Sequence, residues 1–218
     1  MLYNSCYNNK LIAIGCDKFV QLFNLRESGI NFNLKFNLNS NKTIYSIKFD
    51  PFERDILFCG LRSGHLQLLD CRDRSYITEF SPLKGVNYSI VDLFPLSFNG
   101  IGNQVITVGS DGTVLRLDLR KRGIYFPILG HTAEIQNSNF GTYLSEDESI
   151  LALAGKEGCV RFWDPIDGQL LLDPKTIQFP NMVKSLYSLN SKDYGKWMFL
   201  QDNLIQEYSS YTMPSIIP

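Results

Sequence analysis

Short runs of apolar residues recur along the chain, and each is followed by a tight polar turn and a second apolar run. Hydrophobic and polar positions alternate within these runs. In residues 113–118, Val114 and Arg116 are expected on one side of a strand, and Leu115 and Leu117 on the other. No segment shows the helical spacing of apolar residues. The pattern therefore predicts an all-β protein built from hairpins.

Five of these hairpins share one register, in which a turn residue lies six positions before the aromatic residue or leucine that ends the second strand. The five pairs are Asp17 and Phe23, Ser63 and Leu69, Asp111 and Leu117, Glu157 and Trp163, and Asp202 and Tyr208. Successive turn residues are 46, 48, 46 and 45 positions apart. This period is close to the roughly 40–45 residues of a WD40-type propeller blade. The repeat therefore predicts a β-propeller with about five recognisable blades.

Further strands are expected between the hairpins. Inner strands are expected at 43–49, 88–94 and 182–189, with the second ending at Pro95, and outer strands at 76–80 and 169–172. Asp111-Gly112 is expected to form a two-residue turn in which both central residues take positive φ. Four strands per repeat is the organisation of a propeller blade. The expected blades of this single domain, 1–218, are 1–40, 41–84, 85–128, 129–178 and 179–218.

Five blades are fewer than a WD40 ring usually contains, so an incomplete or truncated ring is expected. An open arc leaves sheet edges and apolar faces exposed. The chain is then the C-terminal part of a longer protein, has lost blades, or completes its ring with a partner. The start at Leu2-Tyr3, almost inside a blade, favours truncation or loss at the N-terminus.

Composition excludes several classes of function. The formal net charge of −1 provides no global field for nucleic acid or membrane binding. Five cysteines, an odd number without C-x-x-C spacing, are interpreted as free thiols in a reducing compartment. Two histidines are too few for the usual zinc sites. Without a signal peptide or an apolar run of membrane-spanning length, the chain is expected inside the cell, in the nucleus or the cytoplasm, with no cofactor.

The fourth repeat resembles the WD40 family at both of its ends. Gly130-His131 opens this repeat, and Trp163-Asp164 closes its third strand. The resemblance implies a buried hydrogen-bonded network of His131, Trp163 and a turn acid, here Glu157 in place of the usual aspartate. Residues 151–155 offer no serine or threonine to complete this network. A structural role for His131 is favoured over catalysis, because no nucleophile or orienting partner accompanies it in sequence.

A narrower resemblance concerns the ends of two neighbouring blades. Leu69-Asp-Cys-Arg72 and Leu117-Asp-Leu-Arg120 resemble the WD-x-R box of the receptors that load substrates onto cullin-4 ubiquitin ligases, and Phe23-Asn-Leu-Arg26 is a poorer match. The resemblance implies that Asp70, Arg72, Asp118 and Arg120 dock the ligase's damaged-DNA-binding-protein adaptor. The aspartates are expected to bond local backbone amides, and the arginines to offer donors to a partner.

The order of segments over residues 50–175 is similar to the fourth branch of the cullin-4-associated factors. The matching segments are Gly60–Gly64, Asp70–Arg72, Asp118–Arg120, Gly130–Glu134, Ser145–Ser149 and Ile150–Gly155. The resemblance implies a substrate receptor whose partners are the adaptor and a substrate protein.

No other motif indicates chemistry. Arg116, Arg120, Lys121 and Arg122 form a basic cluster, interpreted as a solvated loop in preference to a phosphate site. No phosphate-binding loop or marked carboxylate pair is present. A non-catalytic interaction scaffold is therefore expected. The alternatives are a generic WD40 scaffold in RNA processing or chromatin and, less favoured, a propeller enzyme with polar groups converging on its channel.

Overall fold

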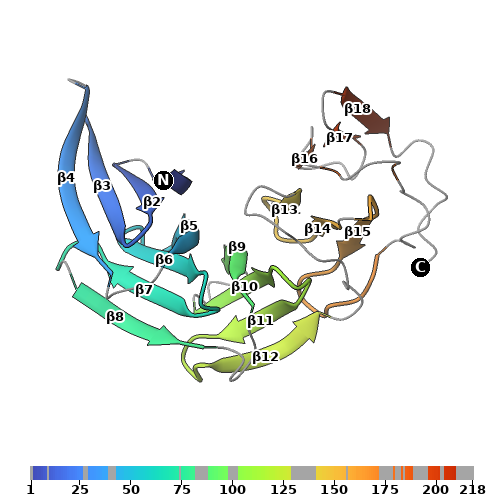
Figure 1. Ribbon diagram of the computed structural model, residues 1–218. Helices are drawn as coiled ribbons and strands as arrows, with labels where there is room; N and C mark the ends of the chain where they lie inside the picture. Colours follow the sequence, from blue (N-terminus) through green and yellow to red (C-terminus); the bar gives the residue numbers. More distant parts are fainter. Residues whose placement is uncertain are drawn as a thin grey trace. The chain divides into compact units, whose positions relative to one another are not determined.

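The computed structural model of the chain is shown in Figure 1. It describes residues 2–8, 10–26, 29–38, 43–73, 75–81, 88–97, 103–128, 141–155, 157–171, 179, 183, 185–188, 196–201 and 204–209. These residues contain β-strands and no helix. The all-β prediction is therefore confirmed.

In the described part of the chain, eighteen strands form five antiparallel sheets, and successive strands are neighbours in each sheet. The first sheet contains β1 (Leu2–Tyr7), β2 (Leu11–Cys16), β3 (Phe19–Arg26) and β4 (Gly29–Asn37). The second contains β5 (Ile44–Phe49), β6 (Ile56–Leu61), β7 (Leu66–Asp70) and β8 (Ser75–Phe80). The third contains β9 (Ile90–Leu96), β10 (Gln104–Gly109), β11 (Val114–Asp118) and β12 (Gly123–Ile128). The fourth contains β13 (Thr142–Leu144), β14 (Leu151–Ala154) and β15 (Val160–Trp163), and the fifth β16 (Ser185–Ser188), β17 (Lys196–Gln201) and β18 (Leu204–Ser209).

The five predicted hairpins are all present, as β2–β3, β6–β7, β10–β11, β14–β15 and β17–β18. Two expected strands differ from those in the structure, and the first of them begins at Ile90 and not at Tyr88. Strand β9 continues through Pro95, which pairs with Val105, because an edge strand does not need every N–H for its ladder. The expected outer strand at 169–172 is reduced, among the residues described there, to an isolated bridge between Leu170 and Trp163.

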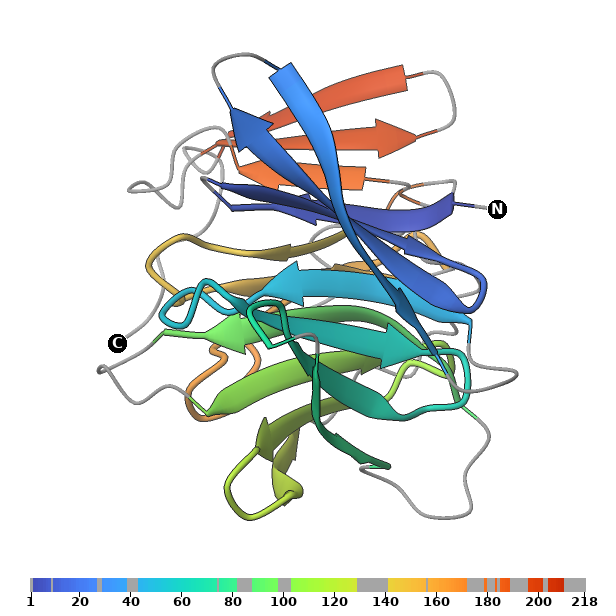
Figure 2. The same cartoon turned by 90° about the vertical axis from the view of Figure 1, so that its left-hand side faces the viewer.

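The chain divides into two compact units. The first consists of Met1–Pro127 with Gln136–Ser138 and holds the first three sheets, in which the strong twist of β3 and β4 is visible in Figure 2. The second consists of Ile128–Ile135 with Asn139–Pro218 and holds the fourth and fifth sheets. Within the first unit, β1, β5 and β9, the first strands of the three sheets, lie side by side.

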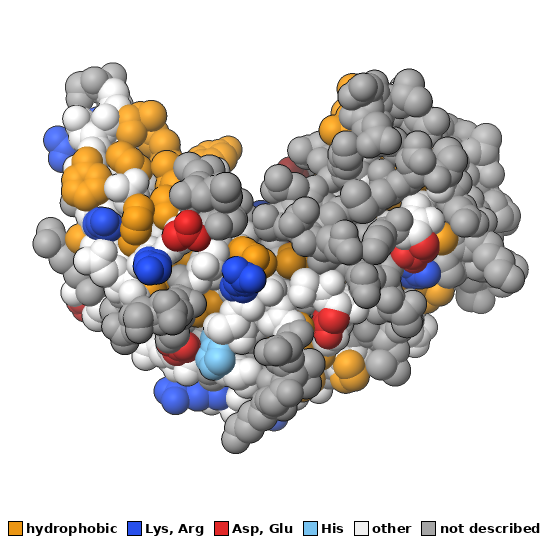
Figure 3. All heavy atoms as spheres, in the orientation of Figure 1, with side chains coloured by type: hydrophobic (Ala, Val, Ile, Leu, Met, Phe, Trp, Pro, Cys, Tyr) orange, Lys and Arg blue, Asp and Glu red, His pale blue; other side chains and the backbone are white. Residues whose placement is uncertain are grey.

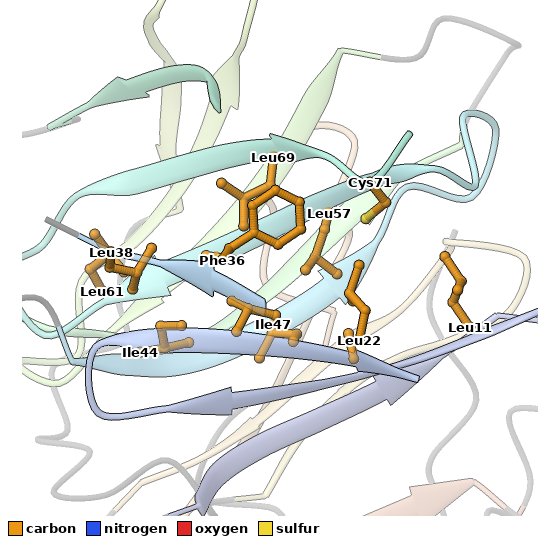
Figure 4. Close-up of a cluster of buried hydrophobic side chains, with 13 residues drawn as sticks. Leu11, Leu22, Phe36, Leu38, Ile44, Ile47, Leu57, Leu61, Leu69 and Cys71 are labelled. Atoms are coloured by element: carbon orange, nitrogen blue, oxygen red, sulfur yellow. The ribbon is translucent and has the colours of Figure 1, made fainter. Parts of the chain in front are cut away.

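Apolar side chains are buried between consecutive sheets of each unit. We call the side of a sheet that is turned to the next sheet in the chain its front face, and the opposite side its back face. The first core joins Leu11, Ala13, Val20, Leu22, Phe36 and Leu38 of the first sheet to Ile44, Ile47, Leu57, Cys59, Leu61, Leu69 and Cys71 of the second sheet and its flanking residues (Figure 4). Each fully buried leucine-sized side chain contributes about 1.5–3 kcal/mol. Sheet-on-sheet burial is therefore the main stabilising contribution.

The same arrangement is repeated in two further cores. Between the second and third sheets, Ile56, Phe58, Leu66 and Leu68 pack on Tyr88, Ile90, Leu93, Val105, Leu115 and Leu117. Between the fourth and fifth sheets, Ile150, Ala152, Ala154, Val160 and Phe162 pack on Val183, Leu186, Trp197 and Phe199. The rings of Phe162 and Trp197 meet edge to face with centroids 5.0 Å apart, a favourable aromatic geometry.

Hydrogen-bond register aligns the back-face residues of neighbouring strands into rows. Residues paired across antiparallel strands lie on the same face of the sheet. The rows are Phe49–Leu57–Leu69–Tyr76 in the second sheet, Pro95–Val105–Leu117 in the third and Leu144–Leu151–Trp163 in the fourth. Leu69, Leu117 and Trp163 are fully buried. In the second, third and fourth repeats, the strand-end residues that define the sequence repeat are therefore core residues on the back face.

The hairpin turn of the third sheet has three residues and not the expected two. The N–H of Gly109 donates to the carbonyl of Thr113 at 2.7 Å, and the N–H of Gly112 donates to the carbonyl of Gly109 at 3.1 Å. Gly112 has φ +86°, whereas Asp111 has no positive φ, so the expectation for both central residues is wrong. Such a loop places only its last residue in the left-handed region. The Asp111 carboxylate accepts bonds from the N–H and Oγ1 of Thr113 instead.

Gly60 lies where three strands approach closely. A Cβ at this position would lie 2.2 Å from Ser46 Oγ of β5 and 2.6 Å from Ile90 Cγ2 of β9. Ser46 is fully buried and its hydroxyl donates to the carbonyl of Ile90 at 3.3 Å, so it has little room to move. Gly123 provides a contrast, because its Cβ would meet nothing closer than the carbonyl of Lys121 at 3.7 Å.

We expect Gly60→Ala to lower the free energy of unfolding by about 1–3 kcal/mol through overpacking. The control Gly123→Ala is expected to stay within about 0.5 kcal/mol of the wild type. Urea unfolding followed by circular dichroism measures both. Equal stability of the two variants would contradict the close approach of the three strands.

Candidate functional site

In three sheets, an aspartate with the same local geometry is the last residue of the third strand or directly follows it. Oδ1 of Asp70 accepts the N–H of Arg72 at 2.8 Å, and Oδ1 of Asp118 accepts the N–H of Arg120 at 2.9 Å. These are the backbone bonds expected from the sequence. They form Asx turns, in which a side-chain carboxylate takes the place of a backbone acceptor. Asp164 makes the same turn with the N–H of Ile166 at 2.7 Å, which the sequence had not suggested.

A second bond ties the strand ends of the second and third sheets to the rest of each sheet. The N–H of Cys71 donates to the carbonyl of Asp55, and the N–H of Leu119 donates to the carbonyl of Asn103, both at 2.8 Å. Asp55 and Asn103 each directly precede the second strand of their sheet. The backbone that carries Arg72 is therefore held in the same way as the backbone that carries Arg120.

Arg72 forms a bidentate ion pair with Asp70. Its Nε lies 3.1 Å from Oδ1 and its Nη2 lies 2.7 Å from Oδ2. The Arg72 side chain is 58% exposed, whereas that of Asp70 is 10% exposed. The hydrogen-bonded guanidinium lowers the pKa of Asp70 to about 2 and raises the pKa of Arg72. The pair therefore stays fully charged at neutral pH, and the guanidinium is oriented at the surface.

Arg120 is held less tightly. Its side chain is 61% exposed, and its Nε lies 3.7 Å from Oδ1 of Asp118, too far for a hydrogen bond. The carboxylate of Asp118 is engaged by backbone, because Oδ1 also accepts the N–H of Lys121 at 3.3 Å. Both arginines are thus exposed at equivalent strand ends, but only Arg72 is fixed by its aspartate.

One of the four residues predicted to form an exposed basic cluster does not belong to it. Arg120, Lys121 and Arg122 are exposed, but Arg116 is buried in β11. Its Nε donates to Oε1 of Gln104 at 2.8 Å, and its guanidinium lies 5.2 Å from the centre of the Tyr125 ring. Adjacent strands provide these contacts, so Arg116 has a structural role. The local sequence carries no signal for it.

The expected network of the fourth repeat is described only in part. His131 lies outside the described residues. Trp163 is fully buried, and Asp164 forms the Asx turn described above. Glu157 is exposed and forms an ion pair with Arg161, unlike the buried acid that the resemblance implied. The longer glutamate side chain reaches along the hairpin to this arginine.

The described residues also bear on metal, thiol and membrane-spanning sites. No group of three or more histidine, cysteine, aspartate or glutamate side chains that could hold a metal ion occurs in the described part of the chain. Of the five free cysteines, Cys59 and Cys71 are buried, and burial raises the pKa of the Cys71 thiol to about 12. A helix with the length and hydrophobicity to span a membrane is absent from the described ranges.

Comparison with solved structures shows the fold. The chain is similar to a chain in the crystal structure of a mitotic checkpoint complex, with a TM-score of 0.75 and 15% identity over 98% of this chain. It is also similar to the computationally designed Ika8 protein, with a TM-score of 0.71 and 16% identity over 95% of this chain. The chain spans 61% and 58% of the lengths of those two chains. No family model and no curated protein sequence matches it. The predicted WD40-like β-propeller fold is thereby confirmed.

The Asp70–Arg72 pair predicts a specific acid dependence of stability. The folded pKa of Asp70, about 2, is below the roughly 3.9 of an unfolded chain. A depressed folded pKa contributes stability above the unfolded pKa, and this contribution is lost as the pH falls from about 4 through about 2. Both Asp70→Asn and Arg72→Ala are expected to reduce the fall in unfolding free energy over this range. Urea titrations at several pH values measure it, and an unchanged acid dependence in Arg72→Ala would refute the assignment.

Proposed function

We propose that this protein is a non-catalytic interaction scaffold that acts as a substrate receptor of a cullin-4-type ubiquitin ligase. In this proposal Arg72 and Arg120 dock the ligase adaptor, another surface holds the substrate protein, and the complex works in the nucleus or the cytoplasm. The observation that carries the proposal is the pair of exposed arginines at equivalent strand ends of neighbouring sheets in one compact unit.

The aspartates alone do not account for the arginines. Asp164 forms the same Asx turn with isoleucine at the position that corresponds to Arg72 and Arg120. The turn needs only a backbone N–H two residues after the aspartate, so the arginine side chains are not required for it. Asp70 and Asp118 are therefore assigned a positioning role, and the guanidinium groups are the candidates for binding.

Exposed arginines suit recognition of a protein surface. A guanidinium has five N–H donors, and Arg72 uses two of them on Asp70. The remaining donors can bond carboxylates or carbonyls of a partner. Arginine is also enriched among the residues that dominate binding energy at interfaces. Because Arg72 is already oriented by its ion pair, docking would cost it little side-chain entropy.

The alternative is a generic WD40 scaffold in an RNA-processing or chromatin assembly. In that case Arg72 is explained by its ion pair with Asp70, which covers a carboxylate that is only 10% exposed. Arg120 then has no further role. The two proposals differ in whether loss of the arginine side chains affects binding of the ligase adaptor.

We expect Arg72→Ala combined with Arg120→Ala to abolish co-purification with the damaged-DNA-binding-protein adaptor. Loss of two interface arginines of about 2 kcal/mol each would weaken binding about a thousandfold. Titration of the purified adaptor by calorimetry gives the affinity of each variant.

The matched control is Arg62→Ala. Arg62 is an exposed arginine of the second sheet that follows β6, at the opposite end of β7 from Arg72. Its removal is expected to leave adaptor binding unchanged. Wild-type recovery of the adaptor by the folded double variant would refute docking through these arginines.

A further inference from the structure

The back face of the first sheet carries an apolar row that crosses all four strands. Tyr7 of β1 pairs with Ile12 of β2, Ile12 pairs with Phe23 of β3, and Phe23 pairs with Phe32 of β4. The rings of Phe23 and Phe32 meet edge to face at 5.8 Å between centroids. This row corresponds position by position to Phe49–Leu57–Leu69–Tyr76 of the second sheet. The first sheet therefore has the same back-face pattern as a sheet that is covered by its predecessor.

The row in the first sheet is less buried than its counterpart, and Ile12 and Phe23 of its two central strands are only half-buried. Leu57 and Leu69 of the second sheet are fully buried. In the first sheet Tyr7 is 76% exposed, and Phe32 is 59% exposed. Figure 3 shows hydrophobic side chains gathered over the first sheet, with Lys or Arg side chains beside them. Contiguous apolar patches of this kind mark interaction sites.

A hollow interrupts the same face. It has a volume of about 350 Å³ and is lined by Ser5, Cys6, Tyr7, Ile12 and Leu25. In the packed sheets of this unit, side chains of the opposing sheet fill such space. The hollow is therefore suited to apolar side chains projecting from a second sheet.

The charge of the first sheet indicates the chemistry of its partner. Residues 2–38 contain more cations than acids: the cations are Lys10, Lys18, Arg26 and Lys35, and the acids are Asp17 and Glu27. Lys35 pairs with Gln21, so it lies on the back face, where its Nζ is 4.0 Å from the centre of the Phe19 ring. Two copies packed through this face would bring their lysines together, whereas acidic margins would complement them.

We propose that the back face of the first sheet binds a partner protein through an antiparallel β-sheet that has an apolar face and acidic margins. The partner sheet packs on the row Tyr7–Ile12–Phe23–Phe32 as the front face of the first sheet packs on the second. Aspartate or glutamate at its margin pairs with Lys35. The proposal uses different residues from those assigned to the ligase adaptor, so either can fail without the other.

Site-specific photo-crosslinking in the cells that express the full chain tests the proposal. The probe, p-benzoylphenylalanine, replaces Phe32, and the control probe replaces Tyr125, which is 54% exposed in β12 of the third sheet. We expect a link from position 32 to another protein, in a β-strand next to aspartate or glutamate, in about tenfold excess over the control, as for a site favoured by about 1.4 kcal/mol. Links only to this chain or to a second copy of it, or no excess over the control, would overturn the proposal.

Binding measurements with the purified crosslinked partner complete the test. Phe32→Ala is expected to weaken binding about thirtyfold, as for an interface residue worth about 2 kcal/mol, and Lys35→Glu is also expected to weaken it. Tyr125→Ala is the control and should leave the affinity unchanged. Cys16 lies on the same face, so the partner should also slow its alkylation by N-ethylmaleimide. Unchanged affinity of Phe32→Ala and unchanged alkylation would each refute the proposal.

Discussion

Apolar rows are buried between consecutive sheets of each unit, and this constraint limits both the residues of each sheet and the register of its strands. A sheet that packs on both sides must present apolar residues on both faces, which is why β6 and β7 of the second sheet are buried along their whole length. Because side chains alternate with a period of two, a slip of one residue would exchange Leu69 with its neighbours on the front face. The sheet-on-sheet contacts therefore hold the register of each hairpin.

This constraint also explains how the fold persists at 15–16% identity to structures of similar shape. Core positions tolerate exchange among apolar residues if volume and pattern are kept. In the second, third and fourth repeats the strand-end position accordingly holds Leu69, Leu117 and Trp163, each fully buried on a back face. Such positions specify a fold through the apolar character of their residues and through their spacing along the chain. The surface residues between them can differ from protein to protein.

The candidate interaction residues depend on the same register. Once the third strands are fixed in the cores, Asp70 and Asp118 reach equivalent ends of adjacent sheets, where each closes an Asx turn. The following arginines leave the backbone at equivalent points and are exposed. The same alternation of side chains gives the first sheet an apolar back face. This face has the pattern of a covered face, yet Tyr7 and Phe32 are exposed to solvent.

Features that rest on local order could be predicted from the amino-acid sequence. The alternation of hydrophobic and polar positions, the turn residues and their spacing of 45–48 positions identified the five hairpins. The same pattern placed both D-x-R pairs at strand ends. The three-residue turn at Asp111 was missed, because a dipeptide does not specify loop length. Contacts between side chains on different strands and sheets became known from the folded chain alone. The tertiary structure buried Arg116 against Gln104, paired Glu157 with Arg161 and left the row containing Phe32 uncovered. The physical reason is that burial depends on neighbours far away along the chain, whereas the period of a pattern depends only on the strand that carries it.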